Sequence, residues 1–217
     1  MNLTTKRIVP FISFLCIAAC IGDLLITYIL GRQYPGYNHA TDTLSRLGAS
    51  ASPVSNAISV WWVILGTVFI IFAIGFGIRY RDKGKTVIIA ALLIALYGLG
   101  EGMGSGLFKA DRIGGSSSIP AIIHDIMGGV GIIAILILPK VIQRLFPEEG
   151  HRAFYRLSSV VFYIGLLSTL LFFTRYAGDN ILGYYKGLWQ RITLLNTYAY
   201  FFVIAIRMVR PAHQNEA

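Results

Sequence analysis

The residues of this sequence that could do chemistry are a few ionisable groups inside long apolar segments. Glu101 lies at the centre of a run, from Gly98 to Gly106, in which glycine alternates with other residues. A carboxylate near the middle of a bilayer costs roughly 2.5–3.5 kcal/mol on insertion scales, and a glycine in a helix costs about 1 kcal/mol relative to alanine. A sequence that tolerates both at one place is typical of a polar site that the backbone approaches closely.

Two further groups in apolar segments complete a set that could transfer protons. Asp23 supplies a second carboxylate and His124 an imidazole. A carboxylate can act as a general base, and an imidazole as a general acid or a metal ligand. We therefore predict Glu101, His124 and Asp23 as catalytic residues. The structural alternative for each is a buried ion pair or a hydrogen bond between helices.

Other polar residues, in the same apolar segments or in the loops next to them, are predicted to bind a ligand. Arg191 could hold an anionic headgroup, or it could be the counter-ion of Asp23 or Glu101. The predicted ligand-binding residues are Arg191, Asp125, Asn196, Lys109, His39 and Ser45.

A metal centre is the least favoured chemistry for these residues. A zinc site needs three or four ligands, and only Asp23, Glu101, His124 and His39 could converge on one. Their spacing lacks the closeness of known zinc motifs, so no metal site is predicted. The sequence does not indicate a cofactor either.

These residues must be positioned by membrane-spanning helices. Of the 217 residues, 55% are hydrophobic and 13% are charged, whereas soluble domains carry about 25% charged residues. A helix needs about 20 mostly apolar residues to cross a bilayer, and the sequence contains six such segments. They are residues 8–30, 57–79, 86–108, 119–139, 153–175 and 188–209. We predict an all-α, six-transmembrane-helix bundle that forms a single membrane domain over residues 1–217.

The net charge of +9 is distributed as expected for a membrane topology. Twelve of the 19 lysine and arginine residues fall on the side of the six-span arrangement that holds both termini, and seven fall on the other side. This bias predicts that both termini are cytoplasmic in a multi-pass protein of the cell membrane. The expected partners are membrane lipids and a small or amphiphilic ligand, not nucleic acid. An oligomer is compatible with the sequence.

Counting along the predicted helices places the ionisable residues at one depth. Asp23 and Glu101 each lie seven residues from the outer end of their spans, about 10 Å below the interface at 1.5 Å per residue. His124 and Asp125 lie five and six residues into the fourth span, and Arg191 lies early in the sixth. Ionisable groups in a bilayer normally face the bundle interior. We therefore predict an outward-facing polar pocket.

The outer loop over residues 31–56 is expected to cover this pocket. Its residues 41–48 have the composition of a short helical segment, with Leu44 and Leu47 turned toward the bundle. The tryptophan pair at 61–62 would anchor the second span near the interface.

The glycine run is expected to bring neighbouring helices close together. At 100° per residue, Gly98, Gly102 and Gly106 share one face of the third span, and Gly100 and Gly104 lie nearly opposite. Small residues spaced by four allow helices to approach closely. We therefore expect the third span to be central, with a close neighbour on each side.

Several short motifs resemble those of one known membrane family. They are Leu44-Ser45-Arg46-Leu47-Gly48 with Pro53 and Asn56, Gly106-Leu107-Phe108-Lys109-Ala110-Asp111, His124, and Gly187-Leu188-Trp189-Gln190-Arg191-Ile192. In these motifs the chain resembles the bacterial "domain of unknown function 998" membrane family, which is distantly similar to the Frag1/DRAM/Sfk1 group of six-span proteins. The resemblance implies a six-span fold and an association with lipid handling, but no defined reaction. The chain departs from the family pattern at Arg46, where that pattern has an acid, and at Lys109, where proline is frequent.

Three functions are compatible with these observations. The leading prediction is an integral membrane protein whose polar pocket binds a small or amphiphilic, lipid-like ligand, which requires a larger cavity with apolar access. The first alternative is a membrane-embedded hydrolase or transferase acting on lipid at the outer leaflet. It would use Glu101 or Asp23 as general base and requires Glu101 and His124 within reach of each other. The second alternative is a structural membrane subunit, in which salt-bridged pairs fill the space.

Overall fold

The computed structural model describes residues 3–113, 116–178 and 180–210. Within them, six helical stretches are long and apolar enough to cross a membrane, which confirms the predicted fold class. The stretches are Arg7–Arg32, Ser55–Lys83, Lys85–Leu107, Ile119–Leu145, Glu148–Tyr176 and Lys186–Val209. The elements in chain order are α1 (Leu3–Arg32), α2 (Ser45–Gly48), α3 (Ser55–Tyr80), η1 (Arg81–Lys83), α4 (Lys85–Tyr97), η2 (Gly98–Gly104), α5 (Ser105–Leu107), β1 (Arg112–Ile113), β2 (Ser116–Ser117), α6 (Ile119–Leu145), α7 (Glu148–Phe173), η3 (Thr174–Tyr176), α8 (Ile181–Tyr184) and α9 (Lys186–Val209).

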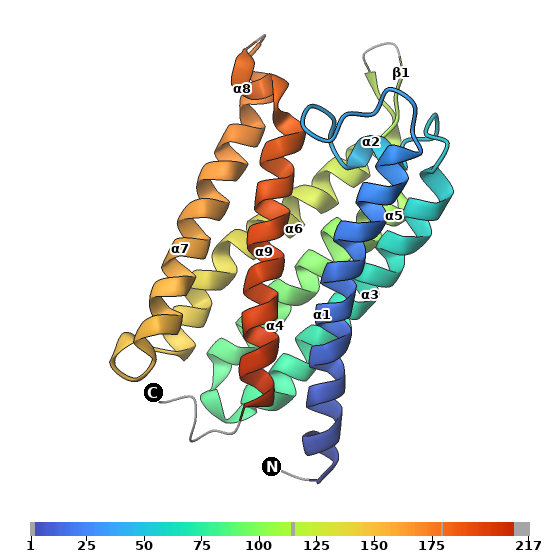
Figure 1. The fold of residues 1–217 in the computed structure, drawn as a ribbon. Helices are drawn as coiled ribbons and strands as arrows, with labels where there is room; N and C mark the ends of the chain where they lie inside the picture. The colour runs from blue at the N-terminus through green and yellow to red at the C-terminus, as the bar shows by residue number, and fades with distance from the viewer. Residues whose placement is uncertain (1–2, 114–115, 179, 211–217) are drawn as a thin grey trace.

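The long helices form an antiparallel bundle in which neighbours in the chain are neighbours in space (Figure 1). α1 packs against α3, α3 against α4, α4 against α6, α6 against α7, and α7 against α9, while α9 closes the ring against α1. The start of α1 and the end of α9 lie at one end of the bundle, which we name the terminal end. The opposite end, named the loop end, carries α2, α8 and the short antiparallel pair of β1 and β2.

Hydropathy located the apolar part of each helix but not its polar ends. α6, predicted to end at residue 139, continues through Pro139 to Leu145, and α7 begins at Glu148 rather than at residue 153. A proline lacks the N–H that a helix uses, but membrane bundles tolerate it because neighbouring helices help to satisfy the freed backbone group. The helices therefore extend past the segments that the sequence alone defined.

The third stretch changes its helix type where its glycines lie. α4 is followed by the π-helical segment η2 and then by the short helix α5. A Cβ built on Gly102 would lie 2.4 Å from Gly66 Cα in α3, and one built on Gly100 would lie 2.2 Å from the Met127 carbonyl oxygen in α6. Such distances leave no room for a side chain. The prediction of a close neighbour on each glycine face is confirmed, whereas the π-helical form was not predicted.

The loop between α1 and α3 covers the loop end. It contains the one-turn helix α2, and Leu44 and Leu47 are buried as predicted. The helical part is shorter than the segment predicted over residues 41–48, because the Asp42 carboxylate accepts the backbone N–H of Asn38 at 2.8 Å and so closes a turn before the helix.

Aromatic rings fill the bundle interior on the terminal-end side of its polar residues. Phe69 of α3 contacts Tyr97 of α4 and both Tyr198 and Phe201 of α9, with ring centroids 5.2–5.9 Å apart. All four rings are at most 4% exposed. The two tyrosines therefore bring their hydroxyl groups from an apolar core to the buried polar residues nearer the loop end, Asp23, Glu101 and His124 with their partners, which we name the polar layer.

Candidate functional site

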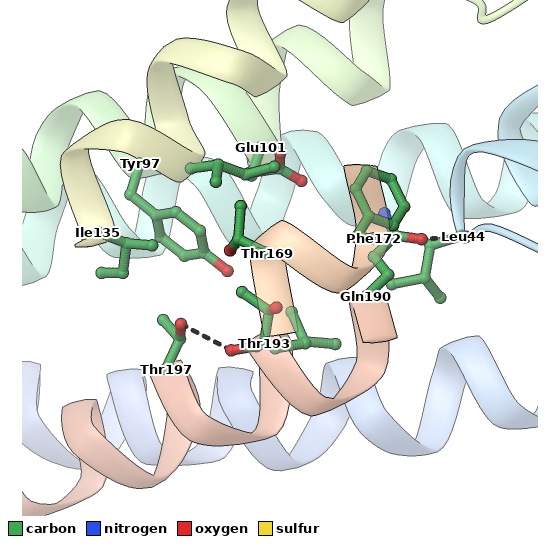
Figure 2. A pocket seen from close by; sticks show the side chains of 11 residues that line it. Leu44, Tyr97, Glu101, Ile135, Thr169, Phe172, Gln190, Thr193 and Thr197 are labelled. Atoms are coloured by element: carbon green, nitrogen blue, oxygen red, sulfur yellow. Dashed lines mark hydrogen bonds between the residues drawn. The ribbon is translucent and has the colours of Figure 1, made fainter. Parts of the chain in front are cut away.

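Glu101 of η2 lines two small, adjoining cavities in the bundle interior. The first has a volume of about 40 Å³ and the second of about 30 Å³. Figure 2 shows the first cavity, with Tyr97, Thr169 and Gln190 around it. A buried water molecule needs about 10–15 Å³ of such space. The cavities therefore suit a few water molecules or a small ion, and they are too small for a lipid headgroup.

The Glu101 carboxylate forms no hydrogen bond or ion pair with any residue that the structure describes. α6 makes room for it through glycine, since a Cβ built on Gly128 would lie 3.1 Å from Glu101 Oε1. The hydroxyl of Thr169 in α7 lines the same cavity and is also buried without a partner among the described residues. The Glu101 carboxylate and the Thr169 hydroxyl can therefore both form hydrogen bonds that no described residue provides.

Asp23 of α1 lines the second inner cavity together with Glu101, but unlike Glu101 its carboxylate is hydrogen-bonded within the protein. Trp61 of α3 donates its indole N–H to Asp23 Oδ1 at 2.8 Å, and Tyr198 of α9 donates its hydroxyl to Oδ2 at 2.9 Å. Asp23 is only 1% exposed. Both carboxylate oxygens are thus used to join three helices, and Asp23 could act as a base only by giving up one of these bonds.

His124 of α6 is hydrogen-bonded through both ring nitrogens. Its Nδ1 lies 3.0 Å from the Phe108 carbonyl oxygen, and its Nε2 lies 3.0 Å from Ser45 Oγ in α2. A carbonyl oxygen can only accept, so Nδ1 carries a proton, and in the neutral form of the ring Nε2 is the acceptor for the Ser45 hydroxyl. His124 is 5% exposed. The fold therefore places a serine hydroxyl against the ring nitrogen that is unprotonated when the imidazole is neutral.

A larger crevice opens at the loop end and meets this layer at Ser45. Its volume is about 310 Å³, and its charged lining consists of Arg46, Arg175, Lys186 and Asp125. Ser45 lines both the crevice and the second inner cavity. The crevice thus has an excess of positive charge and a serine at the point where it approaches the bundle interior.

Arg191 binds the loop rather than a carboxylate. It donates to the carbonyl oxygens of Asp42 and Gly187 at 3.0 Å each, to the Tyr37 hydroxyl at 2.6 Å, and to His39 Nδ1 at 3.3 Å. Neither Asp23 nor Glu101 forms an ion pair with Arg191 or with any other described residue, so the counter-ion alternative was wrong. We name this set of hydrogen bonds the Arg191 clasp, since it holds the loop between α1 and α3 on α9.

Two other predicted ligand-binding residues also have partners within the protein. Lys109 donates to Ser55 Oγ at 2.6 Å and to Ser59 Oγ at 2.7 Å, which fixes the segment after α5 on α3. Burial lowers the pKa of the Lys109 ammonium group from its ordinary value. Asn196 donates to the Val161 carbonyl oxygen at 2.9 Å and joins α9 to α7.

The structure therefore divides the predicted site residues into groups. Glu101, Asp23 and Ser45 share one inner cavity, and His124 is bonded to Ser45. Asp125 lies in the crevice beyond Ser45. The remaining four lie in separate contacts described above: Arg191 with His39 in the clasp, Lys109 on α3, and Asn196 between α9 and α7.

Several residues of the polar layer were not predicted from the sequence. Trp61, expected to be an interface anchor, and Tyr198 hold Asp23. Gln190 lines both inner cavities, and its Oε1 accepts the Leu44 backbone N–H at 2.8 Å. A polar residue early in an apolar span was a usable signal for Gln190, whereas no local signal marks a tryptophan as a carboxylate partner.

The six spanning helices define a polytopic α-helical membrane protein. The family model described as "Protein of unknown function (DUF998)" matches residues 17–207, so the chain belongs to this family. No curated protein sequence and no solved structure shows a significant match to the chain. The similarity to the Frag1/DRAM/Sfk1 group stays a prediction from the sequence.

Proposed function

We propose that this protein binds an amphiphilic, lipid-like ligand whose anionic head lies in the loop-end crevice. The observation that carries the proposal is the crevice itself, about 310 Å³ in volume, with three cationic side chains and one carboxylate in its lining. A cleft with one dominant sign of charge attracts and concentrates ligands of the opposite sign. The inner cavities at Glu101 are too small for a headgroup, so the crevice is the better place for one.

Two of the three cations are available to a ligand. Arg175 and Lys186 form no ion pair with any described residue, whereas Arg46 pairs with Asp42 at 2.6 Å. The Arg175 guanidinium stacks on the Phe172 ring, with its central carbon 3.9 Å from the ring centroid. Its Nη2 also donates to the Tyr176 hydroxyl, and its Nε is buried. The Nη1 group of this fixed guanidinium is therefore the donor left for a phosphate or carboxylate group.

Apolar side chains beside the crevice would accommodate the tails of such a ligand. Ile126 lies next to Asp125 on α6 and is 62% exposed, and Phe173 at the end of α7 is 46% exposed. In a membrane protein these side chains face lipid. An anionic head in the crevice with tails along α6 and α7 therefore satisfies both the charge and the apolar surface.

Native mass spectrometry of the purified protein in detergent tests this proposal. We expect phosphatidylglycerol to stay bound more firmly than phosphatidylcholine. The double variant Arg175→Gln/Lys186→Gln should bind phosphatidylglycerol about 30-fold more weakly, since each basic residue at a membrane surface contributes about 1 kcal/mol.

Arg144→Gln is the matched control, because Arg144 is an exposed arginine near the terminal end of α6. Its phosphatidylglycerol binding should equal that of the unchanged protein. Equal loss in the control and in the double variant would show that the lipid responds to total charge rather than to the crevice, and would overturn the proposal.

A purely structural role is less well supported by the geometry. That role requires salt-bridged pairs that fill the polar layer, but neither Asp23 nor Glu101 forms an ion pair with a described residue. Glu101 also lines two cavities. A polar layer that is costly to place in a membrane and is left partly unpaired favours a ligand-related role.

A further inference from the structure

We propose that Ser45 and His124 are a nucleophile and its general base, and that they cleave a carboxylic ester of the amphiphile bound in the crevice. The identity of the substrate rests on the proposed function, whereas the reactivity of the pair does not. The sequence predicted Ser45 only as a ligand-binding residue.

The geometry is that of an activated hydroxyl group. Ser45 Oγ lies 3.0 Å from His124 Nε2, within the range expected for a nucleophile and its base. The other ring nitrogen donates to the Phe108 carbonyl oxygen at 3.0 Å, which fixes both the orientation and the tautomer of the ring. A third group that orients the base completes the arrangement of a catalytic triad, with a backbone carbonyl in the place of a carboxylate.

The position of Ser45 gives its hydroxyl access to a substrate. Ser45 is half-buried and lines the crevice, where a headgroup would lie between Arg175 and Lys186. On its inner side it lines the cavity that also contains Gln190. Gln190 is held by the bond from the Leu44 N–H to its Oε1, next to Ser45 in the chain, and Figure 2 shows this pair. Its amide N–H₂ group is therefore a donor available to a developing oxyanion in that cavity.

The reaction balances with water as the only co-reactant. Ser45 Oγ attacks the ester carbonyl carbon while its proton passes to His124 Nε2. The bond from that carbon to the alcohol oxygen then breaks, and His124 returns the proton to the departing oxygen. A water molecule then attacks the carbonyl carbon of the acyl-serine and gives one proton to His124. The bond from that carbon to Ser45 Oγ breaks, and His124 passes the proton to Ser45 Oγ, which releases the carboxylic acid and restores the serine hydroxyl. The imidazolium formed at each stage keeps its Nδ1–H bond to Phe108.

The structural alternative is that the hydrogen bond between Ser45 and His124 only holds α2 against α6. The two roles differ in one measurable property, because a structural serine is not nucleophilic. A fluorophosphonate probe reacts covalently with activated serines and carries no anionic headgroup, so it reports on the pair without requiring the natural ligand.

The experiment treats the purified full chain in detergent with a fluorophosphonate and locates the adduct by peptide mass spectrometry. We expect an adduct on Ser45 that is absent in Ser45→Ala. In His124→Gln its rate of formation should fall by about 100-fold or more, as for loss of a general base. The matched control is Ser105→Ala, because Ser105 lines the same inner cavity; its labelling should be unchanged.

Failure of the catalytic role of Ser45 and His124 can be distinguished from failure of lipid binding in the crevice. No adduct on Ser45 in the folded, unchanged protein would overturn the pair's catalytic role even if His124→Gln failed to fold. Arg175→Gln/Lys186→Gln should lose lipid and keep the Ser45 adduct, because the fluorophosphonate does not need the two cations. Unchanged labelling in a folded His124→Gln variant would also overturn the proposal.

Discussion

At the scale of single residues, two carboxylates that line the same inner cavity, Asp23 and Glu101, have different surroundings. Asp23 accepts hydrogen bonds at both oxygens, whereas Glu101 accepts none from the described residues. A buried polar group without a partner costs free energy, so Asp23 is a structural junction and Glu101 is the group that a small polar ligand or water would satisfy. The sequence predicted the common depth, but a residue's depth does not determine its partner.

His39 gives a pH-dependent prediction at this scale. Burial, together with the charges of Arg191 and Arg32, lowers the pKa of His39 from its ordinary value of 6.5. Below that value the unfolded loop binds more protons than the folded loop, so the contribution of His39 to stability is complete above 6.5 and is lost as pH falls through the lowered pKa. Protonation also removes the Nδ1 acceptor that Arg191 uses.

Amide hydrogen exchange measures this loss. After correction for intrinsic rates, protection of residues 33–44 should decrease between about pH 7 and about pH 5. His39→Gln, which keeps an acceptor but does not titrate, should remove this decrease. The same decrease in His39→Gln would show that another group controls the Arg191 clasp.

At the scale of elements, the π-helical segment η2 is what places Glu101 between α3 and α6. Its glycines alternate between the two neighbours, with Gly66 of α3 on one side and Gly131 of α6 on the other. Short π-helical segments are frequent at functional sites because they change which side chains face inward. The glycine pattern predicted both contacts, but a spacing rule based on an ideal α-helix could not predict the wider turn.

Gly100→Ala tests whether these contacts stabilise the bundle. Its Cβ would lie 2.2 Å from the Met127 carbonyl oxygen and 2.9 Å from the Gly131 nitrogen, both of them backbone atoms. Since the backbone must move, we expect the free energy of unfolding to fall by about 1–3 kcal/mol. Thermal unfolding in detergent measures the change.

Gly129→Ala is the control, since nothing lies within 4 Å of a Cβ built there on α6. It should be neutral or slightly stabilising, because alanine favours a helix over glycine. Equal stability of the two alanine variants would contradict a close contact at Gly100.

At the scale of the whole molecule, the charge bias assigns a side of the membrane to each end of the bundle. The first and last spanning helices begin and finish at the terminal end (Figure 1), as an even number of spans requires. We propose that the terminal end is cytoplasmic and that the loop end, with its crevice, faces outward. A ligand would then enter from the outer leaflet of the cell membrane.

Cysteine labelling in intact cells tests this orientation. Gln33→Cys at the loop end should react with a membrane-impermeant maleimide, and Asp82→Cys at the terminal end should react only after the cells are permeabilised. Both positions are exposed, and the native Cys16 and Cys20 are buried. The unchanged protein supplies the background, and the reverse labelling pattern would place both termini outside.

The sequence by itself determined the number of spans and the two glycine faces, and it predicted a common depth for the polar groups. Each of these follows from local properties: hydropathy sums along a segment, and a helix has a fixed rise and a nearly fixed turn per residue. Only the tertiary structure decided the partners. Ser45 and His124 are 79 residues apart, and Arg191 binds a loop instead of a carboxylate. Partner choice depends on how each helix is rotated about its axis and on the path of each loop, and both are set by the whole bundle together.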